Sequence, residues 1–246
     1  MAGFAARHSA VAHTFVSVLD DDLTLDDEAG HHLSRVRRIR AGDVITAADG
    51  RGHWRPYVVA RVERGTVGLR AQDAPVEEPR LEPRLVVAFA LTKGAKPDLV
   101  VQKLTELGVD GVTVLAARRS VPRWSDERAA AAVARLRKIA HEAAAQCRRA
   151  RVPEVDGLRP VTDLRGRPGL VLADREGDDP AALRAPSGGE WVLVVGPEGG
   201  FDRAEAAVLE GRRLRLAPHV LRAETAAIAG GAVLATKRTQ APDIRA

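Results

Sequence analysis

The alternation of hydrophobic and polar positions divides this chain into two parts of different character. Residues 13–72 form short alternating segments separated by the turn signals Asp49-Gly50 and Arg64-Gly65. Such dipeptides between alternating segments predict hairpins, and a small β-barrel is the structure that they favour. The acidic run 20–28 is predicted to be a solvated loop. We therefore expect an N-terminal β-domain over residues 1–74.

A different pattern begins after the segment 75–84, whose three prolines and lack of hydrophobic period predict an interdomain linker. Continuous apolar strands then alternate with helical patterns. Repeated β-α-β units of this kind predict a mostly parallel sheet with helices on both faces, here over residues 80–246. The expected strands cover 85–91, 112–115, 170–176, 191–196 and 214–216.

Helix signals are clear between these strands. A helix over 96–108 is predicted by Pro97 in its first turn, an apolar stripe at i, i+4 and i+7, and Gly108 at its end. An alanine-rich helix is predicted over 125–149, and the last helix over 224–238.

Composition and charge narrow the functional classes. The chain has 246 residues and 45% hydrophobic residues but only 3% aromatics, so its core must be built from leucine, valine and alanine. There is no apolar run of membrane-span length, no secretory signal pattern and only one cysteine, and we expect a cytoplasmic protein. The net charge of +5, with basic clusters at 35–40 and from Arg148 onward, suits a polyanionic partner.

Two unusual loops carry the candidate chemistry. The sequence runs from an apolar strand straight into Gly196-Pro197-Glu198-Gly199-Gly200, and a second special segment covers 216–227. Parallel sheets bind ligands outside the carboxyl ends of their strands, so both loops are expected to face one crevice. The phosphate-loop patterns are absent, and Glu198 would repel a phosphate. A ligand with donor or positive groups fits better, such as an adenine amino group, a ribose or a sulfonium.

Five segments, in order, resemble the RsmE-type ribosomal RNA uridine N3-methyltransferases of the SPOUT superfamily. They are HHLSRVRRIRAGDVI (31–45), LTKGAKPDLVVQKLTELGVDGV (91–112), RSVPRW (119–124), EAAAQCRRARVPEV (142–155), and the pair GPEGGFDRAE with LRLAPHVLRAETA. The chain departs from the family at Ala217 and His219, where the family usually has Gly and Arg. His13 stands where the family commonly has Arg.

The resemblance implies an N-terminal PUA-like β-barrel and an α/β SPOUT domain with a C-terminal trefoil knot. It also implies a homodimer that methylates N3 of a uridine in 16S ribosomal RNA, with S-adenosylmethionine as cofactor, no metal and no membrane partner.

The helix after the first loop is predicted from spacing alone: Asp202 and Glu205, spaced as a capping box, begin it.

Site residues follow from the loops and the resemblance together. The candidate catalytic residues are Arg222, to stabilise an anionic uracil, and Glu224, as a base or as an acceptor that locks its loop. The candidate cofactor-binding residues are Leu172, Gly196, Pro197, Glu198, Gly199, Gly200, Leu216, Leu221 and Thr225. The candidate RNA-binding residues are Arg35, Arg37, Arg38, Arg40, Lys93, Arg119 and Arg149, with Lys96, Arg148 and Arg151 beside them.

Two other functions are compatible with the residues alone. One is a non-catalytic RNA-binding or ribosome assembly factor, which would keep the β-domain and the basic clusters. The other is a nucleotide-binding enzyme in which the glycine-rich loop holds an anion. A response to S-adenosylhomocysteine separates the methyltransferase from both.

Overall fold

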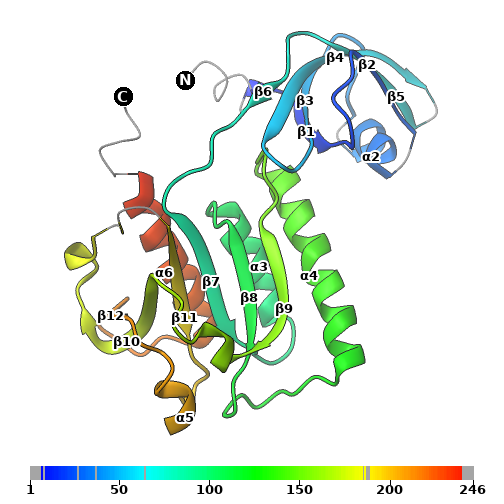
Figure 1. Cartoon of the computed structure of the whole chain (residues 1–246). Coiled ribbons are helices and arrows are strands. Elements are labelled where there is room, and N and C mark those ends of the chain that lie inside the picture. Colours follow the sequence, from blue (N-terminus) through cyan, green and yellow to red (C-terminus); the bar gives the residue numbers. More distant parts are fainter. Residues whose placement is uncertain are drawn as a thin grey trace. The chain divides into compact units, whose positions relative to one another are not determined.

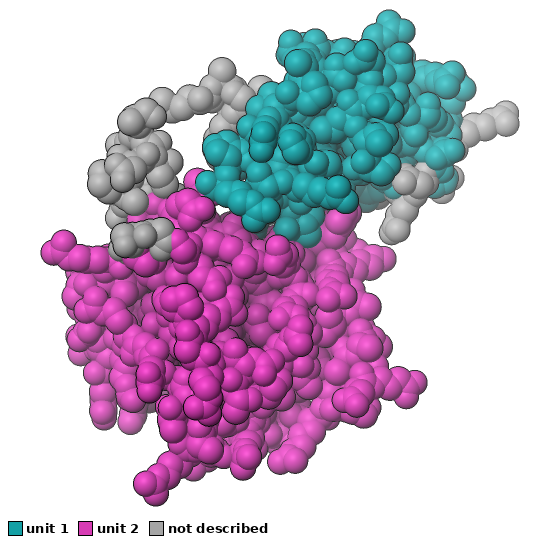
Figure 2. Space-filling view, in the orientation of Figure 1, with its two compact units in different colours: residues 1–80, 144–152 teal, residues 81–143, 153–246 magenta. Residues whose placement is uncertain are grey.

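The computed structural model describes residues 7, 9–26, 28–36, 38–63, 65–184, 186 and 189–239. The chain forms two compact units, the first comprising residues 1–80 and 144–152 and the second comprising 81–143 and 153–246 (Figure 2). The sequence pattern does not assign segment 144–152 to the first unit.

The first unit is built on a six-stranded sheet in which five strands follow the order β1-β3-β4-β5-β2, while β6 pairs with β4 (Figure 1). The strands are β1 (Ala12–Phe15), β2 (Asp22–Leu25), β3 (Val44–Ala48), β4 (His53–Glu63), β5 (Thr66–Ala71) and β6 (Val76–Glu77). Two short helical segments, α2 (Glu28–His31) and η1 (His32–Val36), lie between β2 and β3.

Both hairpin signals are confirmed, because β3 and β4 pair antiparallel across Asp49-Gly50 and β4 pairs antiparallel with β5. The prediction of a loop over 20–28 is wrong in part, because β2 pairs antiparallel with β5. Leu25 is buried while Asp22 and Thr24 are exposed. Asp22 therefore lies on the solvent side of an edge strand, and the short alternation Asp-Leu-Thr-Leu was the signal.

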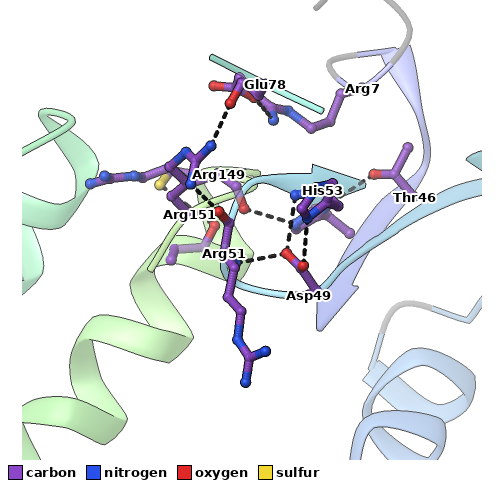
Figure 3. A network of polar contacts seen from close by, with 11 residues as sticks. Arg7, Thr46, Asp49, Arg51, His53, Glu78, Arg149 and Arg151 are labelled. Atoms are coloured by element: carbon purple, nitrogen blue, oxygen red, sulfur yellow. Dashed lines mark hydrogen bonds and ion pairs between the residues drawn. The ribbon is translucent and has the colours of Figure 1, made fainter. Parts of the chain in front are cut away.

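Segment 144–152 contributes to the first unit through its backbone and its arginines. The backbone N–H of Val152 donates to the carbonyl of Gly50 over 3.0 Å, and Gly52 donates to Ala150 over 3.1 Å. The guanidinium of Arg151 donates to the backbone carbonyls of Arg51 and Glu78 (Figure 3). This arginine therefore closes the loop between β3 and β4 onto segment 144–152.

The second unit has a six-stranded sheet of order β12-β10-β11-β7-β8-β9, and every pairing in it is parallel (Figure 1). The strands are β7 (Arg84–Ala90), β8 (Gly111–Ala116), β9 (Glu154–Pro160), β10 (Leu170–Asp178), β11 (Glu190–Val195) and β12 (Arg212–Leu214). The predicted parallel sheet is confirmed. β9 was missed because its sequence is polar and contains Gly157, and β12 begins two residues earlier than predicted.

The helices of the second unit agree with the predicted pattern. They are α3 (Lys96–Glu106), α4 (Asp126–Gln146), the single turn α5 (Arg203–Ala206) and α6 (Ala223–Thr239), with 3-10 turns η2 (Val161–Leu164) and η3 (Pro180–Ala182). Gly108 ends α3 with a φ of 84°, a conformation that glycine adopts without strain. The helix α4 continues into segment 144–152 and so belongs to both units.

The core of the second unit lies on both faces of the sheet. Val86, Ala88 and Ala90 of β7 belong to a cluster that includes η2 and the residues after α5. The alternate residues of β7 are equally buried and face the side covered by α3 and α6. Strands buried on both faces read as continuous apolar runs, which is why the sequence identified them.

Two glycines let α6 approach its neighbours closely. A Cβ at Gly230 would lie 2.5 Å from a methyl carbon of Leu193 in β11, and one at Gly231 would lie 2.5 Å from a methyl carbon of Leu104 in α3. The far end of α6 is fixed by the buried Arg238, which pairs with Asp110 and donates to the carbonyl of Gly108 over 2.7 Å.

Candidate functional site

The edge of the sheet where the parallel strands end, here called the carboxyl edge, brings the two predicted loops together. The loop 196–200 follows β11, and the loop 215–222 follows β12. The strand β10 lies between β11 and β12, and its residues 174–177 bulge out of the pairing with β12. Both loops therefore leave the sheet at the carboxyl edge, and the bulge of β10 lies between them.

A pocket with an empty volume of about 400 Å³ opens at this edge, and we call it the β10–β12 pocket. Its walls come from the bulge in the middle of β10, from the loop after β12 and from the first turn of α6. The residues that line it are Ala173, Asp174, Arg175, Leu216, Ala217, His219, Val220, Leu221 and Ala226. An apolar pocket with a few polar groups at its rim is the usual form of a small-molecule site.

The polar rim of the pocket was not predicted from the sequence. Asp174 accepts from Arg213 over 2.7 Å, and Asp174 and Arg175 both line the pocket. The signal was the abrupt change from the apolar segment 170–173 to the charged segment 174–179. Such a change marks the end of a buried parallel strand, where ligands bind.

Of the predicted cofactor residues, Leu216 and Leu221 line the pocket. Thr225 is exposed in the first turn of α6, and Leu172 packs against the core of the sheet. The two departures from the family, Ala217 and His219, both lie in the pocket wall. Both residues are therefore placed to contact a ligand in this pocket.

The glycine-rich loop 196–200 is not part of the pocket wall, but its shape is well defined. The N–H of Gly200 donates to the carbonyl of Pro197 over 2.8 Å, and Gly200 has a φ of 68° with open space where a Cβ would lie. A Cβ at Gly196 would lie 3.1 Å from the ring of Phe201. Pro197 is buried, while Glu198 and Gly199 are exposed.

This loop is tied to the rest of the second unit at two points. The predicted capping box is present, because Asp202 accepts from the N–H of Glu205 over 2.8 Å and Glu205 accepts from that of Asp202 over 3.1 Å. The buried Glu205 also accepts from the N–H of Arg118 over 2.7 Å. The adjacent Arg119 donates to the carbonyl of Gly199 over 3.0 Å. The loop is thus held in place by the segment after β8.

The two candidate catalytic residues lie at the start of α6. Arg222 is exposed, and Glu224 is 8% exposed. The ammonium of Lys96 lies 3.1 Å from Oε1 of Glu224, whereas Oε2 has no hydrogen-bond partner in the part of the chain that the structure describes. Burial alone would raise the pKa of Glu224. Hydrogen bonds from its own N–H and from Lys96, with the charges of Lys96 and Arg222, outweigh burial and lower that pKa.

The structure separates the candidate RNA-binding residues into several groups. Lys93, Arg38 and Arg40 are exposed, and Arg149 is half-buried. Arg37 and the side chain of Arg35 lie outside the described residues. Arg119 binds the loop 196–200, as described above. Arg151 and Lys96, which were expected beside them, have partners within the chain, and so does Arg148, which donates to the carbonyl of Arg7 over 3.3 Å.

His13 is a buried structural residue of the first unit. Its Nδ1 lies 2.8 Å from the hydroxyl of Thr46, and its Nε2 lies 3.0 Å from the carbonyl oxygen of Arg149. Because the carbonyl only accepts, Nε2 carries the proton and donates. Burial, together with the charge of Arg7, lowers the pKa of His13 to about 4, so the ring is neutral at pH 7.

No helix among the described residues is long and apolar enough to cross a membrane. Over the same residues, no group of three or more His, Cys, Asp and Glu side chains is arranged to hold a metal ion.

The chain is similar to characterised proteins along most of its length. A family model described as an RNA methyltransferase domain matches residues 79–235, and one described as an RNA methyltransferase PUA domain matches residues 25–70. The ribosomal RNA small subunit methyltransferase E of Mycobacterium bovis is 36% identical over 85% of this chain and 84% of that protein. The protein of the same name from Bacillus subtilis is 31% identical over 82% of this chain and 85% of its own length.

A solved structure is similar to both units. The ribosomal RNA small subunit methyltransferase E of Neisseria gonorrhoeae, bound to S-adenosyl methionine, superposes with a TM-score of 0.79 at 25% identity, covering 92% of this chain and 97% of that one. With the parallel sheet, the PUA match and these relatives, the chain belongs to the RNA methyltransferase family, among the ribosomal RNA small subunit methyltransferases E.

Proposed function

We propose that this protein transfers the methyl group of S-adenosylmethionine to N3 of a uridine in 16S ribosomal RNA. The observation that carries the proposal is the β10–β12 pocket, which opens at the carboxyl edge of a sheet in a chain that belongs to this family. A substrate in the small ribosomal subunit would place the enzyme in the cytoplasm.

The pocket fits S-adenosylmethionine by its chemistry. Leu216, Leu221 and Ala226 offer apolar surface to an adenine ring, while Asp174 is an acceptor for amino and hydroxyl groups. Glu224 itself does not line the pocket, but it stands two residues before Ala226, which does, and its Oε2 has no donor among the described residues. The bound cofactor would supply an electrophilic methyl group on a sulfonium. The loop 196–200 would cover the adenosine from the adjacent strand end.

The chain's own residues would stabilise the charge that develops on the uracil. N3 of a uracil carries a proton at neutral pH, and the ring becomes anionic as that proton passes to solvent water, so a cation beside it lowers the barrier. Arg222 is an exposed cation beside the pocket residue Leu221 and would stabilise this anion. Glu224 would act as a positioning residue, because its lowered pKa makes it a weak base.

The family's knot, barrel and dimer are parts of the same proposal. The strand β12 lies at the sheet edge beside β10, yet α6 packs against β7 and β11 in the middle, as threading of the final segment would require. The six-stranded sheet of the first unit and the match of residues 25–70 to a PUA domain support a PUA-like barrel. The exposed apolar side chains of Val220 and Leu99 support a self-association surface on the second unit.

Calorimetric titration tests the proposal. S-adenosylhomocysteine should bind the wild-type protein, and Ala226→Phe should abolish binding because the ring would fill the pocket. Gly200→Val should weaken binding, because its φ of 68° disfavours any side chain and the added atoms occupy the open space beside the loop. Binding of ATP without S-adenosylhomocysteine would favour a nucleotide-binding enzyme instead. RNA binding without either would favour an assembly factor.

A further inference from the structure

The second unit has another polar pocket at its carboxyl edge, which we call the Trp124 pocket. It has an empty volume of about 630 Å³ and is formed by the loop after β7 and the first turns of α4. Thr92, Lys93 and Gly94 come from the loop, while Trp124, Arg128 and Arg135 come from the start of α4 and the segment before it.

Three cations line this pocket, and two of them have no ion-pair partner among the described residues. Lys93 and Arg128 are exposed, and neither has an acidic partner within the described part of the chain. Arg135 pairs with Asp98 over 2.9 Å. Two cations therefore remain to attract an anion such as a phosphate group.

An aromatic ring and an unused hydroxyl complete the lining. The indole of Trp124 is half-buried, whereas the other two tryptophans, Trp54 and Trp191, are 3% and 2% exposed. Thr92 is 4% exposed, and its hydroxyl has no hydrogen-bond partner among the described residues. Buried hydroxyls are nearly always paired in proteins, so this one points to a ligand that supplies the partner.

The position of the pocket relates it to the methyl-transfer site. It lies at the ends of β7 and β8, and the β10–β12 pocket lies at the ends of β10 and β12 in the same sheet. Three strand intervals separate them, which corresponds to about 15 Å. A single RNA strand bound along this edge would reach both.

We propose that the Trp124 pocket binds a nucleotide of the substrate RNA close to the target uridine. The base stacks on the indole of Trp124, the phosphate lies between Lys93 and Arg128, and the hydroxyl of Thr92 bonds to the base or the ribose. A base ring on an aromatic side chain with nearby cations is how proteins hold single-stranded nucleic acid. This inference rests on the proposed function, because it assigns the substrate of that enzyme.

Tryptophan fluorescence gives a direct test, because only one of the three tryptophans is accessible. Titration of the full-length protein with a hexauridylate should quench part of the emission. The quenchable part should be missing in Trp124→Phe. Arg128→Gln should weaken the hexauridylate affinity roughly tenfold, while Lys138→Gln, which removes an exposed cation of α4 outside the pocket, should change it little.

Thr92→Val tests the hydroxyl with almost no change in volume, and it should also weaken binding. Equal effects of Arg128→Gln and Lys138→Gln, or quenching that persists in Trp124→Phe, would overturn the proposal. Uridine monophosphate that binds as tightly as hexauridylate would also overturn it, because the pocket would then serve a free nucleotide. S-adenosylhomocysteine binding, measured on the same variants, should be unchanged. If the wild-type protein did not bind S-adenosylhomocysteine, that result would contradict the proposed function and not the proposal for the Trp124 pocket.

Discussion

The ammonium nitrogen of Lys96 lies 3.1 Å from Oε1 of Glu224, which joins the first residue of α3 to the first turn of α6. This ion pair fixes the start of the helix that forms one wall of the β10–β12 pocket. It also keeps the carboxyl of Glu224 ionised to lower pH, because the pair contributes to the lowered pKa of that group.

The pH dependence of methyl transfer should therefore change in Lys96→Gln. Without the ammonium, the pKa of the buried Glu224 rises, and the carboxyl takes up a proton at a higher pH. The acid limb of the kcat profile should therefore move to higher pH. Lys103→Gln, which breaks an exposed pair with Glu106 in the same helix, should leave the profile unchanged. An acid limb in Lys96→Gln identical to that of the wild type would show that kcat does not depend on the ionisation of the positioning residue Glu224.

Arg222→Gln should reduce kcat without reducing the affinity for S-adenosylhomocysteine. The guanidinium is exposed beside the pocket and would stabilise the anionic uracil only as the reaction proceeds. Loss of one such charge typically costs on the order of 100-fold in kcat. Arg203→Gln, an exposed arginine of α5, is the matched control. An equal loss of cofactor affinity would instead show that Arg222 shapes the pocket.

The stability of the first unit should fall as the pH is lowered from about 6.5 to about 4. The unfolded chain takes up a proton on His13 near pH 6.5, whereas the folded ring does so only near pH 4. The unfolded state therefore binds more protons in this window, and acid favours unfolding by on the order of 3 kcal/mol.

Urea unfolding at several pH values measures this effect. His13→Gln can keep polar contacts with Thr46 and the Arg149 carbonyl but cannot titrate, so its stability should depend less on pH. His32→Gln, at an exposed position, should behave like the wild type. A pH dependence that survives His13→Gln intact would contradict this assignment.

Arg238→Met should destabilise the second unit by about 2–3 kcal/mol. The buried guanidinium pairs with Asp110, which would lose its ion-pair partner and keep the N–H of Leu85 while only partly exposed to water. Chemical unfolding measures the change. Lys103→Met removes an exposed partner and should cost less than about 0.5 kcal/mol. Similar losses for the two variants would show that burial does not distinguish these pairs.

The sequence predicted an element well where the burial of its residues follows a regular pattern along the chain. The buried strands β7 and β11 and the helix α3 carry continuous apolar runs or a regular stripe with Pro97 and Gly108 at the ends. β2 and β9 were missed because edge strands keep polar side chains, and backbone pairing alone defines them. Segment 144–152 belongs to the first unit through contacts far apart in the sequence, which no local pattern records.

The site was predicted only in part for the same reason. The loops 196–200 and 215–222 stand out by their composition, and the parallel sheet brings both to one edge. The role of Asp174 depends on a bulge in β10, and the role of Lys96 depends on the approach of α3 to α6. Both are tertiary relationships between residues that look like ordinary surface charges in the sequence.

The most direct test of the central claim is the analysis of small-subunit ribosomal RNA nucleosides by mass spectrometry, in cells with and without this protein. Loss of 3-methyluridine from the 16S RNA, restored by the wild type but not by Ala226→Phe, is the result that we predict. An unchanged 3-methyluridine content in cells that lack the protein would contradict the account.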